Sequence, residues 1–209
     1  MARRIAVLLL LAMLVAAPAA RADGDPASDY LLSDQTFVPP DDGIPQGYAA
    51  QLLAAVTAAK ARGYTIRVAL IGAPYDLGSV GSLWKKPRDY TRFLGQELAF
   101  VYKGRLLVVM PNGLAISRNG KALPAEQRVV DRIPAPGKNG AALASAGTQG
   151  VLRLAANAGV VVPTPPLTGD TSTPSSSSDR LKIIGGVLIG VVVFLAVYFA
   201  PRLRRRVSS

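Results

Sequence analysis

Three aspartates in this sequence are the best candidates to bind a ligand or a metal ion. Asp76 comes a few residues after the apolar segment 65–71, which predicts a buried strand. Open α/β sheets bind ligands beyond the carboxyl ends of such strands. Asp29 and Asp34 lie near the start of the same region, and carboxylates of this kind could bind a ligand or a divalent metal such as calcium or magnesium. The alternative for Asp76 is structural, with the side chain capping its own turn.

A second candidate site is a concentration of basic and aromatic side chains, called here the basic–aromatic patch. It could bind anionic lipid, an anionic surface polymer or the acidic surface of a partner protein. The alternative is a solvated helix face on which Asp89 pairs with a neighbouring arginine. The patch consists of Trp84, Lys85, Lys86, Arg88 and Arg92.

The residue types that the sequence lacks exclude several kinds of catalytic and metal-binding chemistry. There is no cysteine and no histidine, which excludes disulfides, thiolate and imidazole catalysis and the usual zinc sites. Ser82 and Lys85 match a Ser-x-x-Lys pattern, but its companion motifs are missing. No glycine-rich nucleotide-binding motif occurs, so the sequence predicts no organic cofactor and assigns no catalytic residue.

The charge of +11 is concentrated near the two ends of the chain. Between residues 23 and 179, fifteen Lys and Arg face thirteen Asp and Glu, a net charge of +2. The remaining basic residues flank apolar segments, where they would orient a chain in a bilayer. Nucleic acid is therefore not an expected partner.

The two apolar ends predict export and anchoring. Residues 1–22 have the charged start, apolar run and small-residue cleavage site of a signal peptide, with an uncleaved anchor as the alternative. Residues 181–201 predict a transmembrane helix, and the arginine-rich residues 202–209 a cytoplasmic tail. Residues 162–180 are rich in Pro, Ser and Thr and predict a stalk. We expect a single-pass protein of the cell membrane with an extracytoplasmic domain.

That domain, residues 23–161, predicts alternating helices and strands. Helical spacing follows Gln46 as far as Gly63, and a second helix begins at Pro87. Segments 65–71 and 106–110 read as buried strands, and Gly140 begins an Ala-rich helix. Turn dipeptides at 112–113 and 119–120 predict hairpins. The expected fold is α/β, a three-layer sandwich with a small, mainly parallel sheet and an antiparallel hairpin.

The order of these elements resembles the TPM domain, a membrane-associated α/β domain of bacterial surface proteins and of chloroplast proteins linked to photosystem repair. The similarity covers about residues 28–119 and includes the Asp-Tyr-Leu-Leu at 29–32, the strand at 66–70 and the Lys-Gly-Arg-Leu-Leu-Val-Val at 103–109. Some members of that family are reported as acid phosphatases or metal binders. Lys103 stands where the family usually has an acid.

Two functions follow as expectations. The first is a membrane-anchored extracytoplasmic domain that acts as a binding or assembly module at the cell surface. The second is a membrane-tethered phosphatase or other hydrolase, with or without a divalent metal, for which Asp76 is the leading candidate for a catalytic or metal-binding residue.

Overall fold

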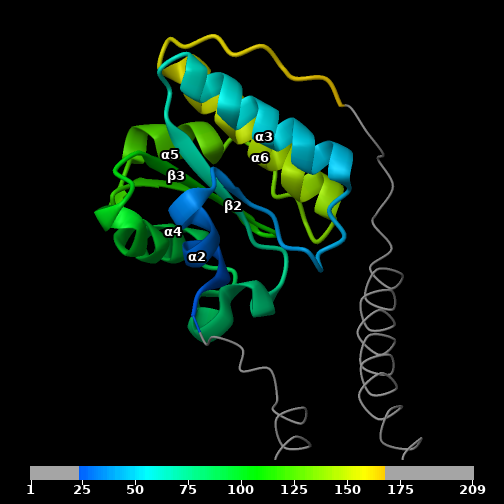
Figure 1. Ribbon diagram of the computed structural model, residues 1–209, viewed down its shortest axis with the longest axis vertical. Helices are drawn as coiled ribbons and strands as arrows, with labels where there is room; N and C mark the ends of the chain where they lie inside the picture. Colours follow the sequence, from blue (N-terminus) through cyan, green and yellow to red (C-terminus); the bar gives the residue numbers. More distant parts are fainter. Residues whose placement is uncertain (1–23, 168–209) are drawn as a thin grey trace, which may run out of the picture.

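The computed structural model describes residues 24–167. The predicted signal peptide, transmembrane helix and tail, and most of the predicted stalk, lie outside these residues. Within them the fold is α/β, with one five-stranded sheet in the order β1-β2-β3-β4-β5 (Figure 1). Between residues 24 and 167 no helix is both long and apolar enough to cross a membrane.

The sheet is parallel on one side of β3 and antiparallel on the other. Its strands are β1 (Thr36–Phe37), β2 (Ile66–Leu70), β3 (Arg105–Met110), β4 (Gly113–Arg118) and β5 (Lys121–Ala122). β1, β2 and β3 pair in parallel, whereas β3–β4 and β4–β5 are antiparallel. The expected hairpin is therefore confirmed, but the sheet as a whole is mixed rather than mainly parallel. The second hairpin, β4–β5, follows the predicted turn at 119–120, whereas the short strand β1 was not predicted.

Helices cover both faces of the sheet, so the three expected layers are present (Figure 1). The helical segments are α2 (Pro26–Ser33), α3 (Gln46–Ala61), the 3₁₀ segment η1 (Pro74–Leu83), α4 (Pro87–Glu97), the 3₁₀ turn η2 (Leu98–Phe100), α5 (Pro124–Val130) and α6 (Gly140–Asn157). The sequence predicted α3, α4 and α6 close to these bounds. It missed α2 and α5, which are short.

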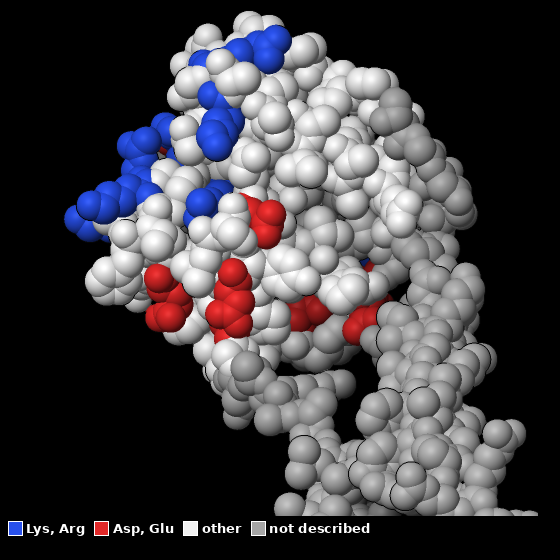
Figure 2. Space-filling model, viewed as in Figure 1, with Lys and Arg blue, Asp and Glu red and all other residues white. Residues whose placement is uncertain are grey.

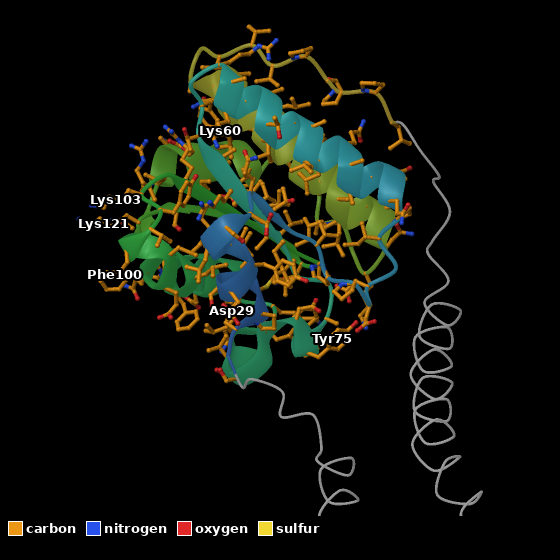
Figure 3. All side chains as sticks on the ribbon, viewed as in Figure 1. Asp29, Lys60, Tyr75, Phe100, Lys103 and Lys121 are labelled. Carbon is orange, nitrogen blue, oxygen red and sulfur yellow. The ribbon has the colours of Figure 1, made fainter. Side chains whose placement is uncertain are left out.

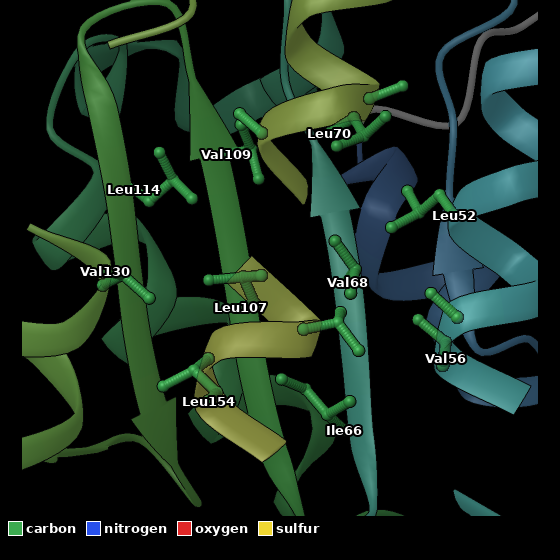
Figure 4. Packing of buried hydrophobic residues seen from close by; sticks show 14 of the residues in the cluster. Leu52, Val56, Ile66, Val68, Leu70, Leu107, Val109, Leu114, Val130 and Leu154 are labelled. Carbon is green, nitrogen blue, oxygen red and sulfur yellow. The ribbon is translucent and has the colours of Figure 1, made fainter. Parts of the chain in front are cut away.

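One core lies between the sheet and the pair α3 and α6 (Figure 4). Leu52 and Val56 of α3 and Leu154 of α6 pack with inward side chains of β2 and β3, such as Val68. Two glycines of α6, Gly147 and Gly150, face this core. A Cβ at Gly150 would lie 2.7 Å from Leu107 Cδ2, so a larger residue there would require the Leu107 side chain to shift.

The second core lies on the opposite face, under α2, η1 and α4. Tyr90 and Leu94 of α4 are fully buried there, and their i, i+4 spacing is typical of the inner face of a helix. Pro87 occupies the first turn of α4, where the missing N–H costs no hydrogen bond. α4 therefore lies directly above β3 and β4 and carries part of the basic–aromatic patch on its outer side.

Two details differ from the sequence analysis. Leu53 belongs to the apolar spacing that predicts α3, yet it is 45% exposed, because Leu52, Val56 and Ala59 define the buried stripe and Leu53 lies beside it. The chain after α6 also stays with the domain beyond residue 161. Gln51 Nε2 donates to the Pro165 carbonyl at 2.8 Å, and Val162 packs against the α3/α6 core. The first residues of the predicted stalk thus run along α3.

Candidate functional site

Asp76 lies beyond the carboxyl end of β2, in the first turn of η1. Its Oδ2 accepts hydrogen bonds from the backbone N–H of Gly72 at 2.8 Å and of Ala73 at 2.9 Å. The residue is only 4% exposed. The side chain therefore does cap its own turn, as the structural alternative proposed, and it does so at the place where a ligand was expected.

Asp42 is the unexpected neighbour of Asp76. Its Oδ1 accepts a hydrogen bond from the exposed Tyr75 hydroxyl at 2.7 Å, and the carboxylate fills the space where a Cβ at Gly72 would stand. Asp42 Oδ2 is buried and finds no N–H or hydroxyl donor between residues 24 and 167. Burial, and then a carboxyl–carboxyl hydrogen bond with Asp42, raise the pKa of Asp76 to about 7. Near neutral pH a proton on Asp76 can therefore supply the donor that Asp42 lacks.

The other two acidic candidates lie elsewhere. Asp29 is exposed on α2, and Asp34 is exposed just after the end of that helix, where it accepts a hydrogen bond from Ser33 Oγ at 3.0 Å. The structure thus does not bring the three predicted carboxylates together. Within the described part of the chain, no group of three or more acidic side chains is placed to hold one metal ion. The Asp42–Asp76 pair supplies two carboxyl groups, and calcium or magnesium would need further oxygen ligands beside them.

The basic–aromatic patch is divided by the fold. Trp84 packs partly into the second core, and the exposed Lys85 has a positive φ of 59° and accepts a hydrogen bond from Asn112 through its carbonyl. Ser82 and Lys86 are also exposed. Arg88 and Arg92, by contrast, project from α4 toward α5 and line a cavity with it.

This cavity, called here the arginine groove, has a volume of about 570 Å³ and lies between α4 and α5. Its polar rim contains Arg88, Arg92 and Arg128, and its apolar lining comes from residues of β4, β5 and the start of α5: Ile116, Ala122, Leu123 and Pro124. The volume is in the range of ligand pockets, and an apolar floor with a few charged groups is their usual composition.

Two of the three arginines are already paired within the domain. Arg88 Nη2 donates to both carboxylate oxygens of Asp131, at 3.0 and 3.2 Å. Arg92 forms an ion pair with Asp89, as expected if this part of the patch is a solvated helix face. Arg128 makes no ion pair with any residue between 24 and 167, and it is exposed. Counting partners within the described part of the chain, the groove therefore has one guanidinium without an ion pair, Arg128, and two that exposed carboxylates hold in place.

Gln127 forms the wall of the groove next to β4. Its Oε1 accepts from Ile116 N at 3.1 Å, and its Nε2 donates to the Leu114 carbonyl at 3.0 Å and to Asp131 Oδ1 at 2.8 Å. β5 pairs only with the last two residues of β4. The amide side chain thus satisfies the backbone groups that a longer neighbouring strand would have satisfied.

No local pattern in the sequence marks three of the site residues. Asp42 is 34 residues from Asp76, and Arg128 and Asp131 belong to the short helix α5 that gave no clear periodic signal. Asp42 stands in Asp41-Asp42-Gly43, a sequence typical of a turn, so its type alone did not point to a site. One weak sequence signal for α5 was present, because proline is frequent in the first turn of a helix and α5 begins at Pro124.

Comparison with models of known families, with curated proteins and with solved structures finds no match to this chain.

Proposed function

We propose that this chain is a membrane-anchored, extracytoplasmic binding module of the TPM type. The observation that carries the proposal is the arginine groove, which combines free and exchangeable guanidinium groups with an apolar floor. The apolar ends of the sequence support the anchoring and the export. In this view the domain holds a partner at the cell surface.

The groove is best suited to an acidic peptide segment that also carries apolar side chains. A carboxylate of such a segment would bind the free Arg128, and others would replace Asp131 and Asp89 on Arg88 and Arg92. Its apolar side chains would cover Ile116 and the neighbouring floor. A purely polar anionic polymer would leave that floor in water, so a protein partner is the better proposal.

Binding is tested with the full chain in detergent and a fluorescein-labelled peptide of alternating Asp and Leu. Fluorescence anisotropy should show saturable binding that weakens as salt is raised. Arg128→Glu should weaken it by about tenfold or more, since charge-assisted hydrogen bonds contribute about 1.5–3 kcal/mol.

Arg132→Glu is the matched control, because Arg132 is exposed four residues further along and does not line the groove. It should leave the affinity almost unchanged. Equal effects of the two variants, or equal binding of a peptide with Lys in place of Asp, would show that the groove does not recognise acidic segments.

A second function, a tethered hydrolase, is favoured by one observation. Asp76 has a pKa raised to about 7 beside a second carboxyl group, at the carboxyl end of a central strand, and such a group can exchange a proton near neutral pH. Turnover of para-nitrophenyl phosphate by the full chain, with and without calcium or magnesium, tests it. Activity that disappears in Asp76→Asn would support the hydrolase, and no turnover above the rate of that variant would dismiss it.

The anchoring is tested in cells. The mature chain should begin near Asp23, remain with the membrane after carbonate extraction, and be open to protease added from the outside. A soluble cytosolic chain that retains Met1 would contradict the proposal.

A further inference from the structure

One apolar feature of the domain faces water almost completely. Phe100, at the end of η2, is 95% exposed, and the next residue, Val101, is 58% exposed. We call these two residues the Phe100 tip. Burial of a phenylalanine is strongly favourable, so a tip of this kind indicates a surface that another apolar phase covers.

The tip is held outward by the buried Leu98 on one side and the partly buried Tyr102 on the other. Leu98 is 1% exposed and fixes the start of the turn in the second core. On the other side the Tyr102 hydroxyl donates to the Arg105 carbonyl at 2.8 Å, and the Arg67 guanidinium lies 4.2 Å from the centre of the Tyr102 ring. Phe100 and Val101 therefore project from a fixed turn and not from a loose loop.

Cationic side chains lie at the same end of the sheet. Lys103 comes two residues before Arg105, the first residue of β3. In the sheet, Arg105 lies opposite Arg118 of β4, and Arg118 lies opposite Lys121 of β5. Lys103, Arg118 and Lys121, called here the basic edge, are exposed, and none of them forms an ion pair with any residue between 24 and 167. In Figure 3, Lys103, Lys121 and Phe100 follow one another along one side of the domain, away from Asp29 and Tyr75.

We propose that the Phe100 tip and the basic edge form a docking surface for an anionic lipid bilayer. Phe100 enters the boundary between headgroups and acyl chains, while the three cations bind lipid phosphates around it. A bilayer fits better than an acidic protein, because the tip projects and carries a single aromatic side chain, whereas a protein partner would need a matching pocket. None of these residues lines the arginine groove, although Lys121 is the neighbour of Ala122 in its lining.

The absence of cysteine from the chain allows a direct test. In the full chain, Val101→Cys provides a single attachment point for the dye NBD and leaves Phe100 in place. On vesicles of phosphatidylcholine with phosphatidylglycerol, the dye emission should move to the blue and be quenched by doxyl-labelled lipid. Vesicles of phosphatidylcholine alone should give little of either effect.

Charge reversal and truncation identify the contributing groups. Lys103→Glu with Lys121→Glu should reduce the docked fraction relative to the undocked one by about tenfold or more, and Phe100→Ser should reduce it as well. The same dye at Leu53→Cys, on α3 in the opposite helix layer, is the control and should report water on both kinds of vesicle.

The outcomes separate this surface from the proposed anchor. A chain without a transmembrane helix would fail to float with phosphatidylcholine vesicles, yet vesicles with phosphatidylglycerol would still recruit it through the tip. A tip dye that remains in water on both kinds of vesicle overturns the proposal and leaves an acidic protein as the occupant. A blue shift that the lysine reversals do not change overturns it also.

Discussion

Two buried carboxyl groups in this domain keep their protons at unusually high pH. Burial raises the pKa of Asp25 to about 6, although its carboxylate accepts hydrogen bonds from the Tyr90 hydroxyl at 2.8 and 2.9 Å. The pKa of Asp76 is raised to about 7. Because the unfolded chain releases these protons near pH 4, the folded state binds more protons between pH 4 and pH 7. The contribution of both groups to stability is therefore complete below pH 4 and is lost as pH rises toward 7.

Asp76→Asn should remove the contribution of Asp76 to this pH dependence of stability. An asparagine keeps an acceptor for the N–H groups of Gly72 and Ala73, and its amide can donate to Asp42 as a protonated Asp76 does. Relative to the wild type, the variant should gain free energy of unfolding as pH rises from 4 to 7, by at least about 1 kcal/mol. Urea unfolding at several pH values measures this, and a constant difference between the two proteins would contradict it.

Gln127 should contribute to stability more than an exposed helix residue normally does. Gln127→Ala leaves Ile116 N–H and the Leu114 carbonyl without their partner, and an unsatisfied buried group costs about 1–3 kcal/mol. Gln149→Ala, on the exposed side of α6, is the control and should change the free energy of unfolding by less than about 0.5 kcal/mol. Equal losses in the two variants would show that the amide is not needed at the edge of β4.

At the scale of elements, the crossing of α4 over the β4–β5 hairpin depends on one glycine. A Cβ at Gly95 would lie 2.7 Å from the Gly120 nitrogen and 3.0 Å from Ser117 Oγ. Gly95→Ala improves helix propensity, but it forces α4 away from a backbone that cannot yield easily. We expect a net loss of about 1–3 kcal/mol in denaturant unfolding.

Gly81→Ala is the matched control for this substitution. A Cβ at Gly81 meets no atom within 4 Å, and its φ is not positive. It should be nearly neutral. A neutral Gly95→Ala would instead mean that α4 can shift outward at no cost, and the packing described here would not be tight.

Elements with a strong local pattern were predictable, and those defined by distant contacts were not. The stripe of Leu52, Val56 and Ala59 predicts α3, and the Asn119-Gly120 turn, with φ of 54° and 72°, predicts the second hairpin. By contrast, β1 has two residues and exists because Thr36 and Phe37 pair with β2. In the site, the place of Asp76 followed from the strand before it, whereas its pairing with Asp42 depends on a contact between separate loops.

For the molecule as a whole, the structure places the end of the domain later than the sequence does. Val160 and Val162 pack on the α3/α6 core, and Pro165 is bonded to Gln51. A chain that stops after residue 167 should therefore be as stable as one that stops at 179. A chain that stops after 158 should lose about 1–2 kcal/mol by thermal or urea unfolding. Equal stability of all three would support the boundary at 161.

The charges of the domain are also separated over its surface. In Figure 2 the Lys and Arg side chains gather toward the upper left, and the Asp and Glu side chains lie mainly below them. The exposed Lys103 and Lys121 lie on the basic side of the domain (Figure 3). Asp29 lies away from them, as does Tyr75, whose hydroxyl donates a hydrogen bond to Asp42. Residues 24–167 contain fifteen Lys and Arg and ten Asp and Glu, a net charge of +5. The separation of the two signs would orient the domain near a charged surface.

The outer strands β1 and β5 have only two residues each, and Gln127 occupies the open part of β4. Neither border of the sheet thus presents a row of free amide and carbonyl groups on which another polypeptide could build a further strand. Copies of the folded part, residues 24–167, would therefore offer one another little template for cross-β growth through the borders of this sheet.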